Sequence, residues 1–378
     1  MRRIYVVLLG MMLLAPVVTE AQSSIYSPLG VGFLGRPIGT RSRGAAGGLG
    51  SFDARSAINP AATGGFRRLS ITGSIGTELR SYNALGASAD GLRETRAPFG
   101  QLGGWLRGTP VSFSLTYYPY ADRTYNLIAI DTVEIRGDSL ESSDRIFSDG
   151  AVANIAGALG YTISSRFSVG AALHLITGSA RAGARRNFDQ PGFAAAREEA
   201  QLGFNGLGFS VGIMAALFRE LTVSLAFRND SRLETIADSV AFSRIELPKT
   251  FSGGVLVRPF PAVQWGTTVI RQTWSEAAND LEQIGGANAY DTWEVSSGFE
   301  LGGIPGSTRI PLRLGFRYAQ LPFSSSDQPH EVDISAGSGY DFAGGRAVFE
   351  FSAERIFRRG GGAEEDAWYL TFSVTVRP

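Results

Sequence analysis

From Leu69 to the end of the chain, apolar and polar residues alternate with a period of two. The last segment shows the pattern most clearly, with apolar residues at 368, 370, 372, 374 and 376 and Tyr, Thr, Ser, Thr and Arg after them. Similar segments lie at 69–75, 111–117, 167–175, 221–227 and 312–318. Because successive side chains of a β-strand point to opposite sides, one face of each strand lies in an apolar medium and the other in water. The sequence therefore predicts an all-β protein.

The connections between these segments alternate in length, which favours a membrane barrel over a soluble sandwich. Short connections are at 108–110, 164–165, 218–219, 259–261, 303–307 and 344–345. Long, polar connections are at 81–97, 119–149, 183–201, 236–249, 275–290, 321–329 and 359–365. Transmembrane barrels have tight turns on the periplasmic side and longer loops outside. We expect a transmembrane antiparallel β-barrel of about 14 strands, because seven long and six short connections separate that many strands and an even number closes the sheet.

Two further features favour a barrel with a water-filled interior. Aromatic residues gather near the ends of the predicted strands, as the girdles at the two membrane interfaces require: Tyr117, Tyr118, Tyr120, Trp265, Trp274, Trp293, Tyr318, Trp368 and Tyr369. The polar face carries ionisable side chains, among them Arg228, Glu294, Glu300, Arg313, Arg317, Glu350 and Glu354. The packed core of a sandwich excludes such groups, whereas a water-filled lumen accepts them.

The first 21 residues have the pattern of a secretory signal peptide. A positively charged start is followed by apolar residues 4–18 and by a small-residue cleavage site that ends at Ala21. The apolar stretch is too short to span a membrane as a helix. We expect an exported protein of the bacterial outer membrane, with the signal peptide at 1–21, an N-terminal plug at 22–65 and the barrel at 66–378.

Residues 41–65 show neither a helical nor a strand period. The stretch is rich in Gly and Ala and contains the triplet Asn59-Pro60-Ala61. Pro60 lacks an N–H group and keeps Asn59 out of the α region, so the triplet predicts a fixed turn in an irregular segment. We expect this segment to fold into the mouth of the barrel as a plug, where its backbone groups find partners. A loose periplasmic tail is the alternative, because Gly-rich segments are often mobile.

The composition narrows the classes of function. Basic and acidic residues balance at 35 each among 378 residues, so nothing predicts a nucleic-acid partner. The absence of Cys excludes disulfides, thiolate nucleophiles and Cys-ligated metals. We expect His174 to be an isolated lumen residue, with a Ser–His pair as the open alternative, and His330 to be a solvated loop residue. The sequence therefore predicts no enzyme, no cofactor and no metal site.

Two parts of the sequence resemble the long-chain fatty acid transporter family of outer-membrane barrels, of the FadL/TodX type. The first is the Gly-rich stretch that ends in Asn59-Pro60-Ala61, and the second comprises the strand phrases at 246–255 and 310–318. In that family an N-terminal hatch with an Asn-Pro-Ala triplet precedes a 14-stranded barrel. The resemblance therefore implies that Asn59, Pro60 and Ala61 are hatch residues.

The same resemblance implies a function. Hydrophobic small molecules or lipids, with long-chain fatty acids first among them, would pass the plugged barrel without an energy source and leave sideways into the membrane. The family fold also serves barrels that are similar to the shuttle component of type IX secretion and bind proteins. A protein-binding barrel of secretion or envelope assembly is therefore the alternative function.

Two arginines are candidate ligand-binding residues. Arg313 and Arg317 lie on the predicted inner face beside strands that carry acidic residues. One of these planar, bidentate donors would hold the carboxylate of an amphipathic ligand. The alternative is a structural network of opposite charges on adjacent strands.

Glycines and one proline mark candidate weak points in the wall. Pro119 ends a predicted strand, where it leaves a ladder acceptor unmatched, and Gly103 and Gly104 lie in the neighbouring strand. We hypothesise a lateral opening at this place, with an ordinary strand end as the alternative. The glycines Gly203, Gly206 and Gly208 predict a close approach of the plug or of a ligand, or a bend of the wall.

Overall fold

The computed structural model describes residues 24–84, 87–135, 138–188, 195–237, 240–283, 287–302 and 310–378. The predicted signal peptide at 1–21 and the predicted short connection at 303–307 lie outside these residues. The division into a signal peptide, a plug domain and a barrel domain stays a prediction.

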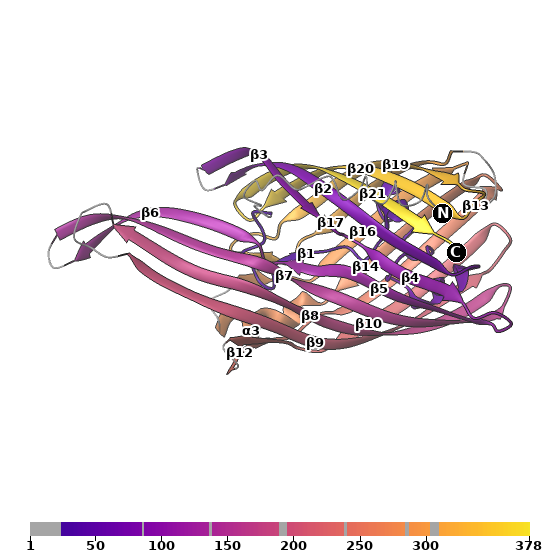
Figure 1. Cartoon of the computed structure of the whole chain (residues 1–378), viewed down its shortest axis with the longest axis horizontal. Helices are drawn as coiled ribbons and strands as arrows, with labels where there is room; N and C mark the ends of the chain where they lie inside the picture. The colour runs from indigo at the N-terminus through magenta and orange to yellow at the C-terminus, as the bar shows by residue number, and fades with distance from the viewer. Residues whose placement is uncertain are drawn as a thin grey trace, which may run out of the picture.

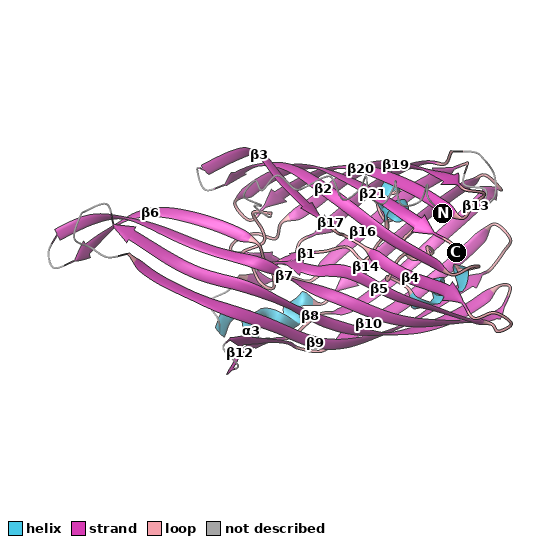
Figure 2. Cartoon of the chain, viewed as in Figure 1, coloured by secondary structure: helices cyan, strands magenta, loops and turns pink. Residues whose placement is uncertain are grey.

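Most of the described chain is β-strand (Figure 2). The strands are β1 (Phe33–Leu34), β2 (Ser70–Ala84), β3 (Ala87–Arg96), β4 (Gly100–Trp105), β5 (Val111–Asp122), β6 (Tyr125–Ile135), β7 (Asp138–Ser164), β8 (Phe167–Phe188), β9 (Ala196–Ala216), β10 (Leu221–Asp230), β11 (Leu233–Ala237), β12 (Val240–Ile245), β13 (Lys249–Phe260), β14 (Val263–Gln272), β15 (Asn288–Ala289), β16 (Thr292–Leu301), β17 (Leu312–Gln320), β18 (Phe323–Ser324), β19 (His330–Phe342), β20 (Ala347–Gly360) and β21 (Ala363–Val376). The helices are α2 (Thr40–Gly44), η1 (Pro60–Gly65), η2 (Trp274–Ala277) and α3 (Ala278–Gln283). None of them, within the described part of the chain, has the length and apolar character of a membrane span.

Within the described residues, the large sheet forms an antiparallel barrel of 14 wall strands. Four wall strands are each built from two consecutive elements: β3 with β4, β5 with β6, β10 with β11, and β12 with β13. The ladder between β2 and β21 joins the first wall strand to the last and closes the sheet. The predicted all-β barrel of about 14 strands is confirmed.

The two faces of the wall are inverted relative to a soluble protein. On β21, Trp368 and Phe372 are 48% and 39% exposed on the outside, whereas Thr371 and Ser373 are buried on the inside. Leu, Ile, Val and Phe side chains stand outward in the same way around the other wall strands. Such a surface suits hydrocarbon and would be unfavourable in water, since exposed apolar patches of this size are rare on soluble monomers. The period-two pattern therefore predicted the facing of the side chains correctly.

The predicted aromatic girdle is only partly right. Trp265, Trp293 and Trp368 are exposed on the outer face, as are Tyr117 and Tyr318. The remaining four aromatic residues are buried inside: Tyr118, Tyr120, Trp274 and Tyr369. The tyrosines occupy inward positions of their strands, and the tryptophan belongs to η2, which lies off the wall.

Three strands continue far beyond the length that a membrane requires. β7, β8 and β9 have 27, 22 and 21 residues, whereas about 9–11 residues span a bilayer. Together with β6 they form a projection at one end of the barrel, opposite the C-terminus (Figure 1). We call that end the outer end and the projection the outer extension.

The outer extension corrects two predicted loops. The connections expected at 119–149 and 183–201 are mostly strand. The sequence pattern did not predict these strands, because both faces of the extension lie in water and no apolar alternation marks them. Opposite charges pair across these strands, and hydrogen bonds from Arg181 and Arg197 lower the pKa of Glu199 below its usual value.

The N-terminal segment runs through the inside of the barrel from the outer end to the opposite end. At the outer end, the Ser24 hydroxyl donates to the Glu365 carboxylate over 3.0 Å, and the Tyr26 hydroxyl donates to the Gly360 carbonyl over 2.9 Å. At the other end, the ring of Phe66 lies against Gly103 of β4. Residues 24–66 therefore contact the inner side of the wall at both ends of the barrel, and their role as a plug stays a prediction.

A belt of glycines lets this segment approach the wall. On Gly170 of β8, a methyl group would lie less than 3.0 Å from the backbone of Pro60, and on Gly315 of β17 it would meet the backbone of Ala45 equally closely. Glycines on seven more wall strands lie equally close to the segment, three of them against its backbone and four against its side chains. The whole set, here called the glycine belt, comprises Gly103, Gly160, Gly170, Gly212, Gly254, Gly266, Gly298, Gly315 and Gly337. The wall thus omits side chains where the backbone of the segment passes.

The glycines singled out from the sequence are not part of this belt. Gly203, Gly206 and Gly208 face residues of β11, the β10–β11 connection and β10 instead of the N-terminal segment. The N-terminal segment does not approach the wall at these three positions, so that part of the prediction was wrong. Glycines do permit such an approach at the positions of the glycine belt.

We predict that a methyl group added to the glycine belt loosens the N-terminal segment. The variants Gly170→Ala and Gly315→Ala place a side chain against backbone that cannot move aside, at a cost of about 1–3 kcal/mol. Amide hydrogen exchange of residues 40–64 should accelerate in both. Gly157→Ala on β7 is the matched control, since nothing lies within 4 Å of its added methyl group. Equal exchange in all three variants would contradict the role of the belt.

Candidate functional site

A cavity of about 210 Å³ lies between the N-terminal segment and the wall. Its apolar lining includes Phe33, Leu34, Ile38, Pro98, Pro119, Phe227, Ile270, Trp274, Ala319, Leu321 and Phe323. Its charged lining comprises Arg36, Arg43, Glu78, Arg96, Asp122, Arg228, Asp230, Glu294, Arg317, Glu331, Asp333, Glu354 and Arg358. The site therefore combines an apolar half with a dense set of charges.

A hydrophobic cap bounds the cavity at the outer end. Trp274 is fully buried, and its ring packs edge-on against Phe323 at a centroid distance of 4.9 Å. Leu281 of α3 and Leu247 belong to the same buried cluster. The cap consists of η2, α3 and the β15–β18 pair, which the sequence had predicted as polar loops.

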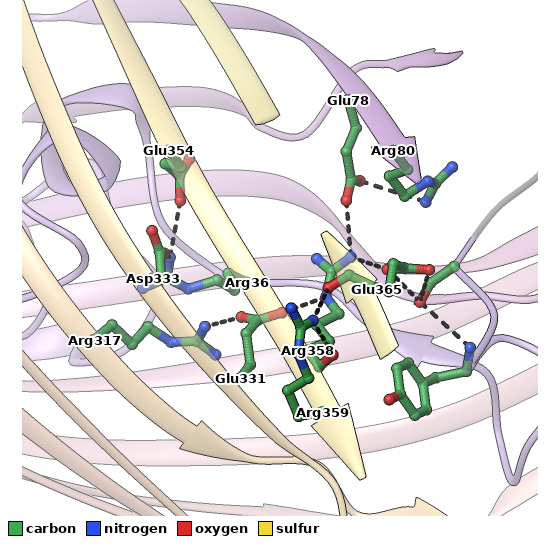
Figure 3. A network of polar contacts seen from close by, with 12 residues as sticks. Arg36, Glu78, Arg80, Arg317, Glu331, Asp333, Glu354, Arg358, Arg359 and Glu365 are labelled. Atoms are coloured by element: carbon green, nitrogen blue, oxygen red, sulfur yellow. Dashed lines mark hydrogen bonds and ion pairs between the residues drawn. The ribbon is translucent and has the colours of Figure 1, made fainter. Parts of the chain in front are cut away.

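Many of the charged side chains of the cavity are joined in a network, part of which Figure 3 shows, whereas Arg228 and Asp230 pair with each other. Arg358 donates to Glu331 over 2.6 Å and to Glu78 over 3.0 Å, and it also pairs with Glu365. Arg317 joins Glu331 to Glu294 of β16. Burying so many charges is tolerable only because each has a partner of opposite sign.

Arginines of the N-terminal segment extend this network. Arg36 lies 3.2 Å from Glu354 and 3.4 Å from Asp333, and Arg43 lies 3.2 Å from Glu354. Further along, Arg41 donates to the Glu300 carboxylate through Nε over 2.8 Å and through Nη2 over 2.9 Å. These contacts tie the segment to wall strands β16, β19 and β20.

Both candidate ligand-binding arginines lie inside such pairs. Arg313 donates to Glu300 over 2.6 Å and lies 3.2 Å from Glu350, and it does not line the cavity. Arg317 lines the cavity but already has Glu294 and Glu331 as partners. The contacts favour the structural charge network over the ligand clamp, and a ligand role for either residue stays a prediction.

The triplet Asn59-Pro60-Ala61 is fixed against the wall. The Asn59 side chain accepts a hydrogen bond from the Ala61 amide over 2.9 Å, which caps η1, and donates to the Ile213 carbonyl over 3.1 Å. Pro60 lies against Gly170. More than one contact therefore holds the triplet in place. The hatch role of Asn59-Pro60-Ala61 stays a prediction.

Near the cavity, β3 and β5 are neighbouring parts of the wall that no β-ladder joins in the described part of the chain. β4 pairs with β5 from Gly100 to Trp105, but the chain then bends at residues 97–99, and β3 pairs with β2 alone among the described residues. On the exposed edge of β5, Phe33 and Leu34 of β1 pair with Asp122 and Ala121. We call the boundary between β3 and residues 118–122 of β5 the lateral seam.

The N-terminal segment covers the lateral seam. The Gly35 amide donates to the Tyr120 carbonyl over 2.9 Å, and Gly35 packs against Pro119. Across the seam, Arg96 of β3 donates to Asp122 of β5 over 2.5 Å. One side chain pair and the short strand β1 therefore replace a β-ladder here.

The residues predicted for a lateral opening lie at different places relative to the seam. Pro119 lies at the irregularity of the β5–β7 ladder and borders the seam. Gly103 and Gly104 lie in the part of β4 whose ladder to β5 is intact. Sequence reasoning missed Pro98, although a second proline, like Pro119, signals a place where a ladder bond is absent. The opening itself stays a prediction.

His174 is not an isolated lumen residue, so that expectation was wrong. Its Nε2 atom lies 2.9 Å from the Ser210 hydroxyl, and its Nδ1 atom lies 3.3 Å from Asn154 Oδ1. The three residues are buried beneath Pro60, and the space beside them is about 10 Å³. A space of this size holds at most one water molecule, so the Ser–His pair has no room for a substrate here.

Comparisons with known proteins place the fold. The family model described as BamG matches residues 1–218, which is more than half of the chain. The chain belongs to the BamG family. A search of curated proteins found no match.

Solved structures with the same fold are outer-membrane barrels. A Pseudomonas aeruginosa FadL homologue superposes with a TM-score of 0.62 at 14% identity, over 91% of this chain and 99% of that one. The toluene transporter TbuX of Ralstonia pickettii gives 0.60 at 14% identity, over 96% and 100%. The Pseudomonas putida toluene transporter TodX gives 0.60 at 14% identity, over 91% and 98%. At these identities the likeness shows the FadL-type barrel fold.

We predict that Glu300 anchors the N-terminal segment. Glu300→Gln removes the carboxylate that Arg41 and Arg313 share, and the loss of one partner of a buried ion pair costs about 3–5 kcal/mol. The melting temperature in detergent should fall, and protease should cleave the segment sooner. Glu364→Gln is the control, because Glu364 is exposed and lies 3.8 Å from Arg359. Equal melting temperatures in both variants would show that this ion pair does not hold the segment.

Proposed function

We propose that this member of the BamG family is a passive outer-membrane channel for hydrophobic small molecules. The observation that carries the proposal is the position of the cavity, which lies directly behind the lateral seam. Pro98 and Pro119 line the cavity and border the seam, and Phe33 and Leu34 of β1, which covers the seam, line the cavity as well. A molecule in the cavity is therefore separated from the membrane by β1 and not by a continuous ladder.

The size of the cavity bears on the solute. Long-chain fatty acids are the solutes that the resemblance implies. A cavity of about 150 Å³ accommodates benzene, whereas sites for larger organic ligands measure about 300–1,000 Å³. The 210 Å³ present here suit one compact molecule or only part of an acyl chain. We propose compact hydrophobic molecules as the first solutes, and fatty acids as solutes only if the seam opens to receive the chain.

The proposed movement is a displacement of β1. Two residues of β1, Phe33 and Leu34, pair with β5, whereas residues 41–66 are held by the glycine belt and by the ion pairs of Arg41, Arg43 and Arg55. The proposal takes β1, which covers the seam, as the part of the segment that detaches. A solute enters from the outer end past the cap, displaces β1 and diffuses sideways into the bilayer. The proposal thus assigns the movement to β1, whereas the resemblance implied a movement near Asn59-Pro60-Ala61.

A reversible disulfide tests the seam. Leu34→Cys with Ala121→Cys puts two thiols directly opposite each other in an antiparallel pair, within the reach of a disulfide, in a chain that has no other Cys. In cells that lack other channels of this fold, uptake of labelled toluene should fall to the background when the pair is oxidised and recover on reduction.

The control for this experiment links the segment to itself. Ile38 and Ser56 form a bridge within the N-terminal segment, so Ile38→Cys with Ser56→Cys adds a disulfide that leaves β1 free. Its uptake should not depend on oxidation. If oxidised Leu34→Cys/Ala121→Cys cells take up toluene at the reduced rate, lateral exit past β1 is wrong.

A protein-binding barrel of secretion or envelope assembly is the second candidate function. The observation that favours it is the outer extension, since β7, β8 and β9 exceed the membrane-spanning length by about twofold and a channel does not require them. Such a polar sheet outside the membrane offers a surface for another protein.

Trimming the outer extension separates the two candidates. A variant in which short turns replace residues 125–148 and 182–200 keeps the registered ends of the strands, because Ala182 and Ala200 lie opposite each other. A channel should keep its toluene uptake after trimming. A protein-binding barrel should lose the proteins that co-purify with the full chain from cross-linked cells, and gel mobility before and after heating shows that both forms fold.

A further inference from the structure

We infer that the cavity selects compact, uncharged molecules that carry a hydroxyl group and rejects their carboxylate analogues. This inference rests on the proposed channel function and names the class of solute. Its basis is the balance of charge around the cavity and one buried oxygen atom without a partner.

The charge balance disfavours an anionic ligand. Among the described residues that line the cavity, six are arginines and seven are Asp or Glu, so the arginines do not outnumber the carboxyl groups. Each of the six guanidinium groups already lies within 4.0 Å of a carboxylate. A ligand carboxylate would join seven Asp and Glu side chains beside only six arginines. To gain an arginine as a partner, it would have to break an existing ion pair. A buried charge without its own partner is strongly unfavourable.

Asp333 supplies a specific polar contact. The residue is fully buried in β19 and lines the cavity. Its Oδ2 atom accepts a long hydrogen bond of 3.4 Å from Arg36, and its Oδ1 atom has no hydrogen-bond partner among the described residues. A buried polar atom without a partner is costly. A hydroxyl group, which both donates and accepts hydrogen bonds, would satisfy it without adding charge.

The rest of the lining selects an apolar body of limited size. Ile38, Ile270 and Trp274 are apolar residues of the cavity lining. Within about 210 Å³ a single ring with small substituents fits beside these side chains. The chemical class is therefore a small aromatic or alicyclic alcohol.

Three probes that share one ring test the inference: toluene, 4-methylphenol and 4-methylbenzoate. Binding to the purified full chain in detergent is measured by calorimetry. We expect 4-methylphenol to bind at least about tenfold more tightly than toluene, as a hydrogen bond to a charged group provides, and 4-methylbenzoate to bind more weakly than either. If 4-methylbenzoate binds as tightly as 4-methylphenol, or toluene binds as tightly as the phenol, the inference is overturned.

Variants on one strand separate the role of Asp333 from general damage. Asp333→Ala should remove the advantage of 4-methylphenol over toluene, and Asp333→Asn should reduce the discrimination against 4-methylbenzoate because one negative charge is lost. Asp341→Asn on the same strand is the control, since Asp341 does not line the cavity. Toluene binding by Asp341→Asn equal to that of the unchanged chain shows that a substitution on this strand leaves the cavity intact.

The outcomes distinguish the two proposals. Binding of all three probes without the expected order overturns the selectivity alone and leaves the channel proposal standing. The absence of binding for all three overturns the channel proposal together with this inference. An unchanged order of affinities in Asp333→Ala overturns the assignment of the hydroxyl contact to Asp333.

Discussion

The close approach of one irregular segment to the inner wall is the constraint on which the rest of this structure depends. A segment without regular secondary structure leaves its backbone groups unpaired unless something else contacts them. Wall side chains provide partners, since the hydroxyls of Thr268 and Ser335 donate to the Gly48 and Gly44 carbonyls, and the glycine belt lets the segment come close enough for these contacts. The wall and the segment therefore share a single packing arrangement, and the cavity is the space that this arrangement leaves toward the outer end.

The interior charges follow from the same filling of the lumen. Arg36, Arg41 and Arg43 bring positive charge into a wall that carries Glu300 and Glu354, and each attraction shortens the distance between segment and wall. In these pairs each charge faces a partner of opposite sign, so the interior is polar and its arginines are already engaged. An apolar or neutral molecule is then the solute that disturbs the network least.

The sequence predicted those features that lipid imposes on every wall strand. Period-two alternation follows from hydrocarbon outside and water inside, so strand number and facing could be derived, and Arg317 was placed on the inner face. The partners of Arg317 could not be predicted, because Glu294 and Glu331 lie beside it only through the register in which β16, β17 and β19 pair. The outer extension gave no alternation because both of its faces are in water. Trp274 was misplaced because an aromatic residue near a strand end suits a girdle and a cap equally well.

The attachment of Ser24 and Tyr26 to the hairpin between β20 and β21 has a consequence for folding. These residues lie more than 330 positions apart along the chain, so the contact is available only after the last hairpin exists. The β2–β21 ladder likewise joins the first and last wall strands. Assembly is therefore expected to be slow, since contacts between residues far apart in the sequence slow folding.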